Sequence, residues 1–208
     1  MCDTDGRATH DEALRAVQVL LSYIGDDPNR PGLRDTPERF LRAWRDWWGK
    51  GYGEIPASYV RVFPHEGATY NQMIFCGDIS FVSHCEHHLA PFFGVAHVAY
   101  LADPSGPGLL GLSKLARIVD HFARRLQVQE RLTEQVADAL SSAIAPANDT
   151  PSVGIQMRAL HLCMVSRGVQ QPSAITTTTS LRGKFLHDPT THDEFLAHCA
   201  QARGSVLK

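Results

Sequence analysis

The sequence predicts an α+β fold in which helices back an antiparallel sheet. Three observations support this prediction. The first third of the chain spaces its apolar residues as helices do, and from about residue 73 the pattern changes to that of strands. From there the order is two strands, two helices and two strands, which indicates an antiparallel sheet with helices packed against it.

Two helices are expected in the N-terminal third. The first ends at Gly25 and Pro28, and its apolar residues recur at helical spacing. These residues are Ala13, Leu14, Val17, Leu20, Leu21 and Ile24. The second helix begins at Thr36 and Pro37, because threonine suits an N-cap and proline suits the first helical position, where an N–H has no partner anyway. It stops at Gly49.

Strands and helices share the rest of the chain. Strand patterns cover residues 79–82, 92–101, 153–165 and 175–180. Helical patterns cover residues 112–122 and 130–144, and a short helix follows the last strand. Ser113 is the expected N-cap of the first of these helices. A turn rich in proline and glycine, residues 103–108, closes the second strand.

The composition excludes several classes of protein. Hydrophobic residues make up 43% and charged residues 20% of the 208 residues, which is typical of globular proteins and not of disordered, collagenous or coiled-coil chains. The formal charge is −2, whereas a general nucleic-acid binder shows a basic excess. No apolar run approaches the ~18 residues of a membrane helix, and the polar start does not resemble a secretory signal. We therefore expect a cytoplasmic protein without a nucleic-acid or membrane partner.

The strongest chemical feature is the run Cys-Glu-His-His at residues 85–88. The chain has five cysteines, an odd and widely spread set, which favours a metal or catalytic role for some of them over a disulfide framework. Cys85 and His88 are three residues apart, and thiolate and imidazole are natural zinc ligands. Spacing alone does not exclude His84 or His87 as the ligand in place of His88.

Cys163 is the best candidate for a third ligand. It lies two residues after His161 on an expected strand, and side chains two apart on a strand share a face, whereas Arg158 should point to the other face. Two cysteines and one histidine leave the fourth zinc position open to water, which is the catalytic type of site. Zinc lowers the pKa of that water towards ~7, and His87 and His161 are then free to move protons. The alternatives are a structural zinc with four ligands, and plain packing.

Basic residues recur in pairs near the expected helix starts. Lys114 and Arg117 are three apart and share a helix face, Arg39 and Arg42 repeat that spacing, and Arg167 lies just beyond the Cys163 segment. Cations converging on a helix N-terminus would suit a polyphosphate. Solvated helix faces are the alternative for any one pair.

Gln129 and Glu130 begin the helix expected at 130–144. A carboxylate can accept two hydrogen bonds from the edge of a guanine ring, which makes Glu130 a candidate for base recognition. A glutamate at a helix start is also commonly a cap or a partner of the helix dipole.

With these motifs in place, the chain resembles the GTP cyclohydrolase I family. The resemblance rests on stretches that run in the family order and span nearly the whole chain after residue 10. They are DPNR, GL and TPER within 27–39, SHCEHHL and PF within 83–92, GLSKLAR at 111–117, QVQERLT at 127–133, HLCM and RG within 161–168, and TTTS at 177–180.

The resemblance implies a fold, an assembly and an activity. The fold is the tunnelling fold, an antiparallel four-stranded sheet with helices on one face, in a catalytic domain of residues 71–208 after a helical extension of residues 1–70. The assembly is a toroidal homodecamer with active sites between subunits. The activity is zinc-dependent opening of the guanine imidazole ring of GTP with loss of formate, then rearrangement and reclosure to 7,8-dihydroneopterin triphosphate, the first step of pterin and folate biosynthesis.

The resemblance also implies a role for each candidate residue. The zinc ligands are Cys85, His88 and Cys163. The catalytic residues are His87 and His161, which transfer protons, and Ser113, which assists the later rearrangement. The substrate-binding residues are Glu130 and Gln129 for the base, and Arg39, Lys114, Arg117 and Arg167 for the triphosphate.

Three departures from the family pattern are visible: Arg158 in place of an acidic residue, a longer turn at 103–108, and Arg42 in place of a lysine. None removes a catalytic group. Two other functions stay open. A nitrile reductase of the same fold would need NADPH and a nucleophilic cysteine free of metal. A purine-binding module would hold zinc with four ligands and bind GTP without consuming it.

Overall fold

The computed structural model describes residues 6–64, 70–145 and 150–202. Contacts divide the chain into two compact units, Met1–Lys50 and Gly51–Lys208. This boundary falls earlier than the one implied by the family resemblance, which ends the extension at residue 70. The assignment of catalysis to residues 71–208 stays a prediction. Cys2 lies outside the described residues.

The first unit is helical, as predicted. Its elements are α1 (His10–Tyr23), α2 (Thr36–Ala43) and a π-helical turn, η1 (Trp44–Trp48). Thr9 caps α1: its hydroxyl accepts the N–H of Glu12, whose carboxylate accepts the N–H of Thr9 in return, so both exposed donors are satisfied. Pro37 lies in the first turn of α2, where a missing N–H costs nothing.

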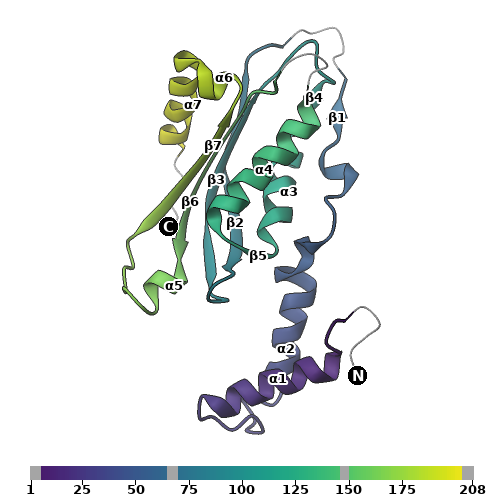
Figure 1. The fold of residues 1–208 in the computed structure, drawn as a ribbon, viewed down its shortest axis with the longest axis vertical. Helices are drawn as coiled ribbons and strands as arrows, with labels where there is room; N and C mark the ends of the chain where they lie inside the picture. The colour runs from purple at the N-terminus through teal and green to yellow at the C-terminus, as the bar shows by residue number, and fades with distance from the viewer. Residues whose placement is uncertain (1–5, 65–69, 146–149, 203–208) are drawn as a thin grey trace. The chain divides into compact units, whose positions relative to one another are not determined.

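The second unit is built on a five-stranded sheet of order β5–β2–β3–β6–β7 (Figure 1). The strands are β5 (Leu126–Gln127), β2 (Met73–Cys85), β3 (Pro91–Leu101), β6 (Val153–His161) and β7 (Ile175–Arg182). The four long strands are antiparallel, which confirms the predicted fold class, and the two-residue β5 is an unpredicted addition that runs parallel to β2. Two short strands, β1 (Val62–Phe63) and β4 (Leu109–Leu110), pair separately. Two 3₁₀ turns, η2 (Lys50–Tyr52) and η3 (Ala57–Tyr59), precede β1 in the chain.

Helices cover the sheet from both sides. The helices α3 (Leu112–Ala123) and α4 (Gln129–Ile144) pack on the face that carries Val98 and Tyr100. The C-terminal helices α6 (Lys184–His187) and α7 (Pro189–Gln201) pack at one end of the other face, where Phe195 meets Ala99. The prediction of helices on one face therefore holds for α3 and α4, and the structure adds α6 and α7 on the other face. No helix in the described part of the chain is long and apolar enough to cross a membrane.

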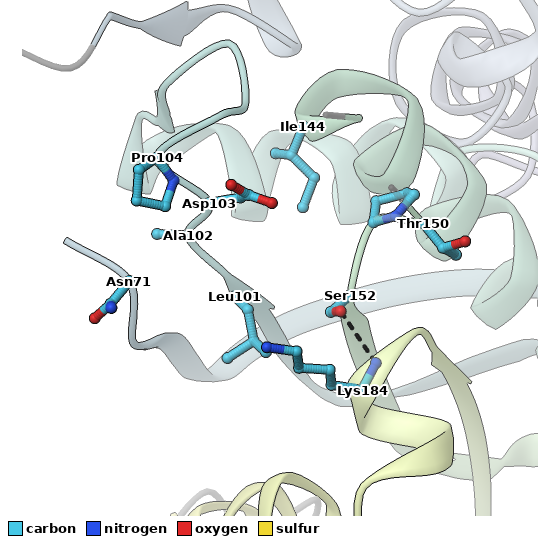
Figure 2. Close-up of a pocket in the computed structure, with 10 residues that line it drawn as sticks. Asn71, Leu101, Ala102, Asp103, Pro104, Ile144, Thr150, Ser152 and Lys184 are labelled. Carbon is cyan, nitrogen blue, oxygen red and sulfur yellow. Dashed lines mark hydrogen bonds between the residues drawn. The ribbon is translucent and has the colours of Figure 1, made fainter. Parts of the chain in front are cut away.

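The two ends of the sheet differ. One end carries Cys85, Pro91 and His161. The opposite end, roughly 30 Å away along β3 at about 3.3 Å per residue, holds a cavity of about 200 Å³. Figure 2 shows this cavity, with the backbone N–H of Lys184 bonded to the Ser152 hydroxyl. Residues of the 103–108 turn line it, so the longer turn lies at the end of the sheet away from the candidate metal ligands.

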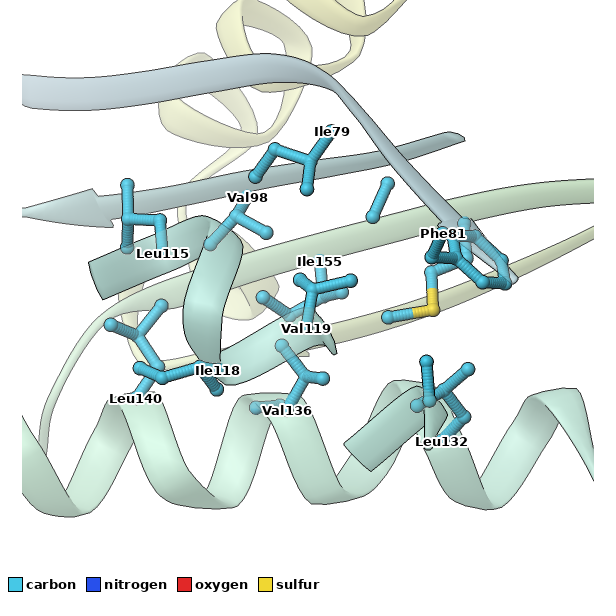
Figure 3. Packing of buried hydrophobic residues seen from close by; sticks show 14 of the residues in the cluster. Ile79, Phe81, Val98, Leu115, Ile118, Val119, Leu132, Val136, Leu140 and Ile155 are labelled. Atoms are coloured by element: carbon cyan, nitrogen blue, oxygen red, sulfur yellow. The ribbon is translucent and has the colours of Figure 1, made fainter. Parts of the chain in front are cut away.

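The core lies between the sheet and the pair α3 and α4. Figure 3 shows that apolar side chains of the two helices pack against apolar side chains of the strands. The helices contribute Leu115, Ile118, Val119, Leu132, Val136 and Leu140, and the sheet contributes Ile79, Phe81, Val98 and Ile155. Burying each such side chain stabilises the fold by roughly 1.5–3 kcal/mol. This packing holds both helices against the sheet.

Two predicted details are wrong. The strand expected over 153–165 ends at His161, and residues Leu162–Val165 form the single helical turn α5. The ladder stops because the β3 residue that follows in register is Pro91, which has no N–H to donate. Ser113 is not an N-cap: Gly111 occupies that position and Ser113 lies inside the first turn of α3.

Candidate active site

Three candidate ligands converge at one end of the sheet. Cys85 ends β2, His88 lies in the turn before β3, and Cys163 lies in α5. One ligand atom from each lies within 4.8 Å of the others, and the Cys85 sulfur is 3.5 Å from Nδ1 of His88. Among the described residues no other group of three or more histidines, cysteines or carboxylates comes this close. The set is the one expected from the sequence, although Cys163 arrives there on a helical turn and not on a strand.

The donor set fits a metal ion. Burial raises the pKa of the Cys163 thiol, and the nearby Cys85 raises it further, because two thiolates so close would repel each other. A divalent cation between them removes that repulsion and stabilises both in the ionised form. Two sulfurs and one imidazole nitrogen match the preference of zinc more than that of magnesium or manganese.

The turn after β2 folds His88 back over Cys85. The carbonyl of Cys85 accepts the N–H groups of His88 and Leu89, at 3.3 and 2.8 Å, and its own N–H donates to the carbonyl of Ala90. Leu89 adopts a left-handed conformation with φ of 54°, uncommon for a leucine. The side chain of Leu89 is exposed, so no apolar burial explains this strain. The strained Leu89 lies in the turn that brings the candidate ligands Cys85 and His88 together.

An ion pair ties this turn to the start of α4. Arg131 donates two hydrogen bonds to the Glu86 carboxylate, at 2.5 and 2.9 Å, and the Glu86 N–H donates to the carbonyl of Gln127. The Arg131 guanidinium lowers the pKa of Glu86. Glu86, the residue after Cys85, is therefore held by Gln127 and Arg131, which lie on either side of Gln129 and Glu130 in the chain.

His161 is held from two sides. Its ring stacks on Phe92, with 4.5 Å between centroids and 3° between planes, and its Nε2 lies 2.8 Å from Oε1 of Gln129. Burial lowers the pKa of His161, while Glu130 acts in the opposite direction. The net lowering favours a neutral imidazole near neutral pH, which is the form that can accept a proton.

The other histidine of interest, His87, lies beside the same sulfur. Its Nδ1 is 3.9 Å from the sulfur of Cys85, farther than that of His88. The rings of His87 and His88 meet edge to face, with 6.1 Å between centroids. His87 is thus adjacent to the candidate metal group.

The residues proposed for the base and phosphates lie at helix starts. Glu130 is exposed in the first turn of α4, while the neighbouring Gln129 is buried. Ser113, Lys114 and Arg117 lie on the first turns of α3, and the Arg117 guanidinium is 5.6 Å from the centre of the Tyr59 ring.

The two remaining arginines are both exposed. Arg167 follows α5. Arg39 belongs to α2 of the first unit and pairs with Asp35 at 2.9 Å. Exposed pairs of this kind contribute little to stability, so Arg39 can exchange this partner for a ligand at small cost.

Sequence reasoning missed the partners that hold these groups. Neither the stacking of Phe92 on His161 nor the pair of Glu86 and Arg131 was expected, because each joins positions far apart in the chain. The only available signal was that all four residues fall within the motifs already singled out. Gln129 was expected to bind the base, which stays a prediction, and the contact of its amide with His161 was not expected.

Comparisons with known proteins agree on one family. The sequence profile of GTP cyclohydrolase I matches residues 13–200. The chain is 49% identical over 179 residues to "GTP cyclohydrolase 1" of Deinococcus radiodurans, covering 85% of this chain and 78% of that protein. It is 44% identical over 200 residues to the protein of the same name from Chlorobium chlorochromatii, covering 92% and 85%. Identity to that of Sinorhizobium fredii is 43% over 194 residues, covering 93% and 91%.

Proposed function

The chain belongs to the GTP cyclohydrolase I family, and from this membership we propose how its own residues carry out the reaction. It is a hydrolase that opens the imidazole ring of GTP, releases formate and forms 7,8-dihydroneopterin triphosphate, a step of pterin and folate biosynthesis. The observation that carries the proposed mechanism is the convergence of Cys85, His88 and Cys163 at the end of the sheet, with His161 on the adjoining strand.

Zinc is the proposed metal, held by Cys85, His88 and Cys163. Three protein ligands leave one coordination position for water or substrate. When bound there, zinc supplies a Lewis acid that makes water nucleophilic at neutral pH. The residues around it then have two tasks, which are to present C8 of the guanine ring to that position and to move protons.

Glu130 and the basic residues position the substrate. The exposed Glu130 carboxylate accepts N–H groups from the edge of the guanine, at a helix N-terminus, with Gln129 beside it. The triphosphate is bound by basic residues on separate elements, which are Arg39, Lys114, Arg117 and Arg167. Holding both ends of GTP in this way converts a loose encounter into one reactive geometry, which is a large share of catalysis.

His161 and His87 move the protons. The stacked, neutral His161 and the neighbouring His87 deliver and remove protons as the imidazole ring opens, and a second hydrolysis then releases formate. Ser113, exposed at the start of α3, assists the rearrangement of the ribose before the ring recloses.

We also propose that the chain works as a toroidal homodecamer in the cytoplasm, with active sites between subunits. The helix α1 and the residue that follows it expose large apolar side chains that assembly would bury, namely Val19, Leu20, Tyr23 and Ile24. A reducing compartment keeps the thiols of Cys85 and Cys163 available to a metal. Analytical ultracentrifugation of the full chain tests the assembly, and a monomer at micromolar concentration would contradict it.

Formate release from GTP tests the function. Purified, zinc-loaded protein is incubated with GTP, and a chelator-treated sample serves as control. Formate from the loaded protein alone supports ring opening at C8 that depends on the metal. Folded, zinc-containing protein that releases no formate would contradict the proposal and favour a module that binds purines without consuming them.

A further inference from the structure

The side chain of Gln129 is committed inside the protein. It is 1% exposed, and its Nε2 lies 3.1 Å from three acceptors, which are the carbonyls of Met157 and Thr176 and the hydroxyl of Thr178. Its Oε1 lies 2.8 Å from Nε2 of His161. Carbonyl oxygens only accept hydrogen bonds, so the amide nitrogen must face them and the amide oxygen must face the histidine.

This orientation determines where His161 carries its hydrogen. An amide oxygen can only accept, so Nε2 of His161 is the protonated nitrogen and Nδ1 of the neutral ring has a free lone pair. Phe92 stacks on the ring face and fixes its plane. We propose that Gln129 is a positioning residue that holds His161 in the Nε2–H tautomer and so makes Nδ1 the nitrogen that exchanges protons with GTP. The catalytic half of this inference rests on the proposed function.

Two threonines orient Gln129 in turn. The hydroxyl of Thr133 donates to the backbone carbonyl of Gln129 at 2.8 Å, and it lies 2.6 Å from the hydroxyl of Thr178. Since the Thr133 hydrogen is used, Thr178 donates to Thr133 and presents a lone pair to the Gln129 amide. The hydroxyl hydrogens of Thr133 and Thr178 thus each have one direction, while the two amide hydrogens of Gln129 are shared among three acceptors. This assigns a role to Thr178, in the threonine run whose function the motifs left open.

The inference separates two possible roles of Gln129. A glutamine that binds the base would stabilise bound GTP, so its loss would raise KM. A glutamine that sets a tautomer would leave GTP binding nearly intact, so its loss would lower kcat. The burial of the amide and the use of both its ends favour the second role.

Solid-state ¹⁵N spectra of metal-loaded protein with labelled histidine test the tautomer directly. The His161→Phe variant assigns the signals by subtraction. We expect an unprotonated, imine-type signal for Nδ1 of His161 and a protonated, pyrrole-type signal for Nε2. In Gln129→Met we expect a mixture of the two tautomers. A pyrrole-type Nδ1 in the unaltered protein would overturn the inference. The expected tautomer in a protein that releases no formate would contradict the proposed function alone.

Steady-state kinetics test the consequence. We expect Gln129→Met to lower kcat by about 10- to 100-fold, a fraction of what general acid–base catalysis contributes, with KM for GTP changed less than about threefold. Thr178→Val should lower kcat in the same direction by a smaller factor, and it remains a test if Gln129→Met does not fold. The matched control is Thr177→Val, an exposed neighbour of Thr178 in β7. A raised KM with unchanged kcat would overturn the inference.

Discussion

The imidazole ring of His161 lies flat on the phenyl ring of Phe92, and the two residues are also the last register pair of the β3–β6 ladder. Phe92 is 0% exposed, so the core fixes its ring. The position of a candidate catalytic group is thereby set by strand pairing. One residue later the ladder ends and the chain turns into α5, which carries Cys163.

Replacing Cys163 by serine should remove metal and activity together. A hydroxyl is a poor zinc ligand, and loss of one ligand of three leaves too few to hold the ion. Metal content by elemental analysis and formate release are measured on the same preparation. Cys76→Ser is the matched control. Cys76 is half-buried and lies outside the ligand group, so this variant protein should keep its metal. Full activity in metal-free Cys163→Ser would refute the metal role.

Replacing His87 and His88 in turn should separate metal binding from proton transfer. We expect His88→Ser to lose metal. His87→Ser should keep metal and lose turnover by about 10²-fold or more, because its role is acid–base. The shorter distance from the Cys85 sulfur to His88 supports this division. Release of metal by His87→Ser would show that the two assignments must be exchanged.

Glu130→Gln should weaken GTP use without affecting the fold. Hydrogen bonds to a charged group contribute about 1.5–3 kcal/mol, so kcat/KM for GTP should fall by about 10- to 100-fold. Glu134→Gln, one turn further along α4, is the matched control, since Glu134 is exposed and pairs with Arg182 at 3.0 Å. Equal effects of the two substitutions would argue against base recognition by Glu130.

Gly94→Ala should destabilise the sheet by about 3 kcal/mol or more. A Cβ at this position would lie 1.8 Å from the carbonyl oxygen of Arg158 and 2.7 Å from Cα of Ala159, and neither backbone group can yield cheaply. Gly53→Ala has no atom within 4 Å and should change stability by less than about 0.5 kcal/mol. Urea unfolding compares both. A normal midpoint for Gly94→Ala would mean that β3 and β6 are less closely packed than described.

His97 should make stability depend on pH. It is 0% exposed, and burial lowers its pKa below the usual 6.5, with Arg158 acting in the same direction and Asp78 against it. The unfolded chain therefore takes up this proton first as the pH falls. Stability from the neutral ring is present above about pH 6.5 and is lost below it, at up to about 1.4 kcal/mol per pH unit.

Unfolding in urea between about pH 5 and 7.5 measures this effect. We expect a shallower pH dependence in His97→Leu, even though that variant loses the hydrogen bond from the N–H of Asp78. The two proteins are compared in the same buffers, so other titrating groups cancel. An identical slope in both would show that His97 is not the group responsible.

Local patterns predicted most of the helices and strands. The apolar spacing in α1, α3 and α4 and the strand runs of β2, β3 and β7 are confirmed, because they depend on residues close in sequence. The predictions of Ser113 as an N-cap and of a strand over 153–165 were wrong, because these features depend on residues far apart in the chain. The start of α3 depends on where the chain leaves β4, and β6 ends where Pro91 of the neighbouring strand cannot continue the ladder.

The candidate soft-metal donor set could be read from the amino-acid sequence, in the run from Cys85 to His88 together with Cys163. The contact of Gln129 with His161 and the pairing of Arg131 with Glu86 could be found only in the folded chain. This is because the direction of a hydrogen bond depends on every donor and acceptor around it. For Gln129 these come from β6, β7 and α4, elements that meet only in the folded chain.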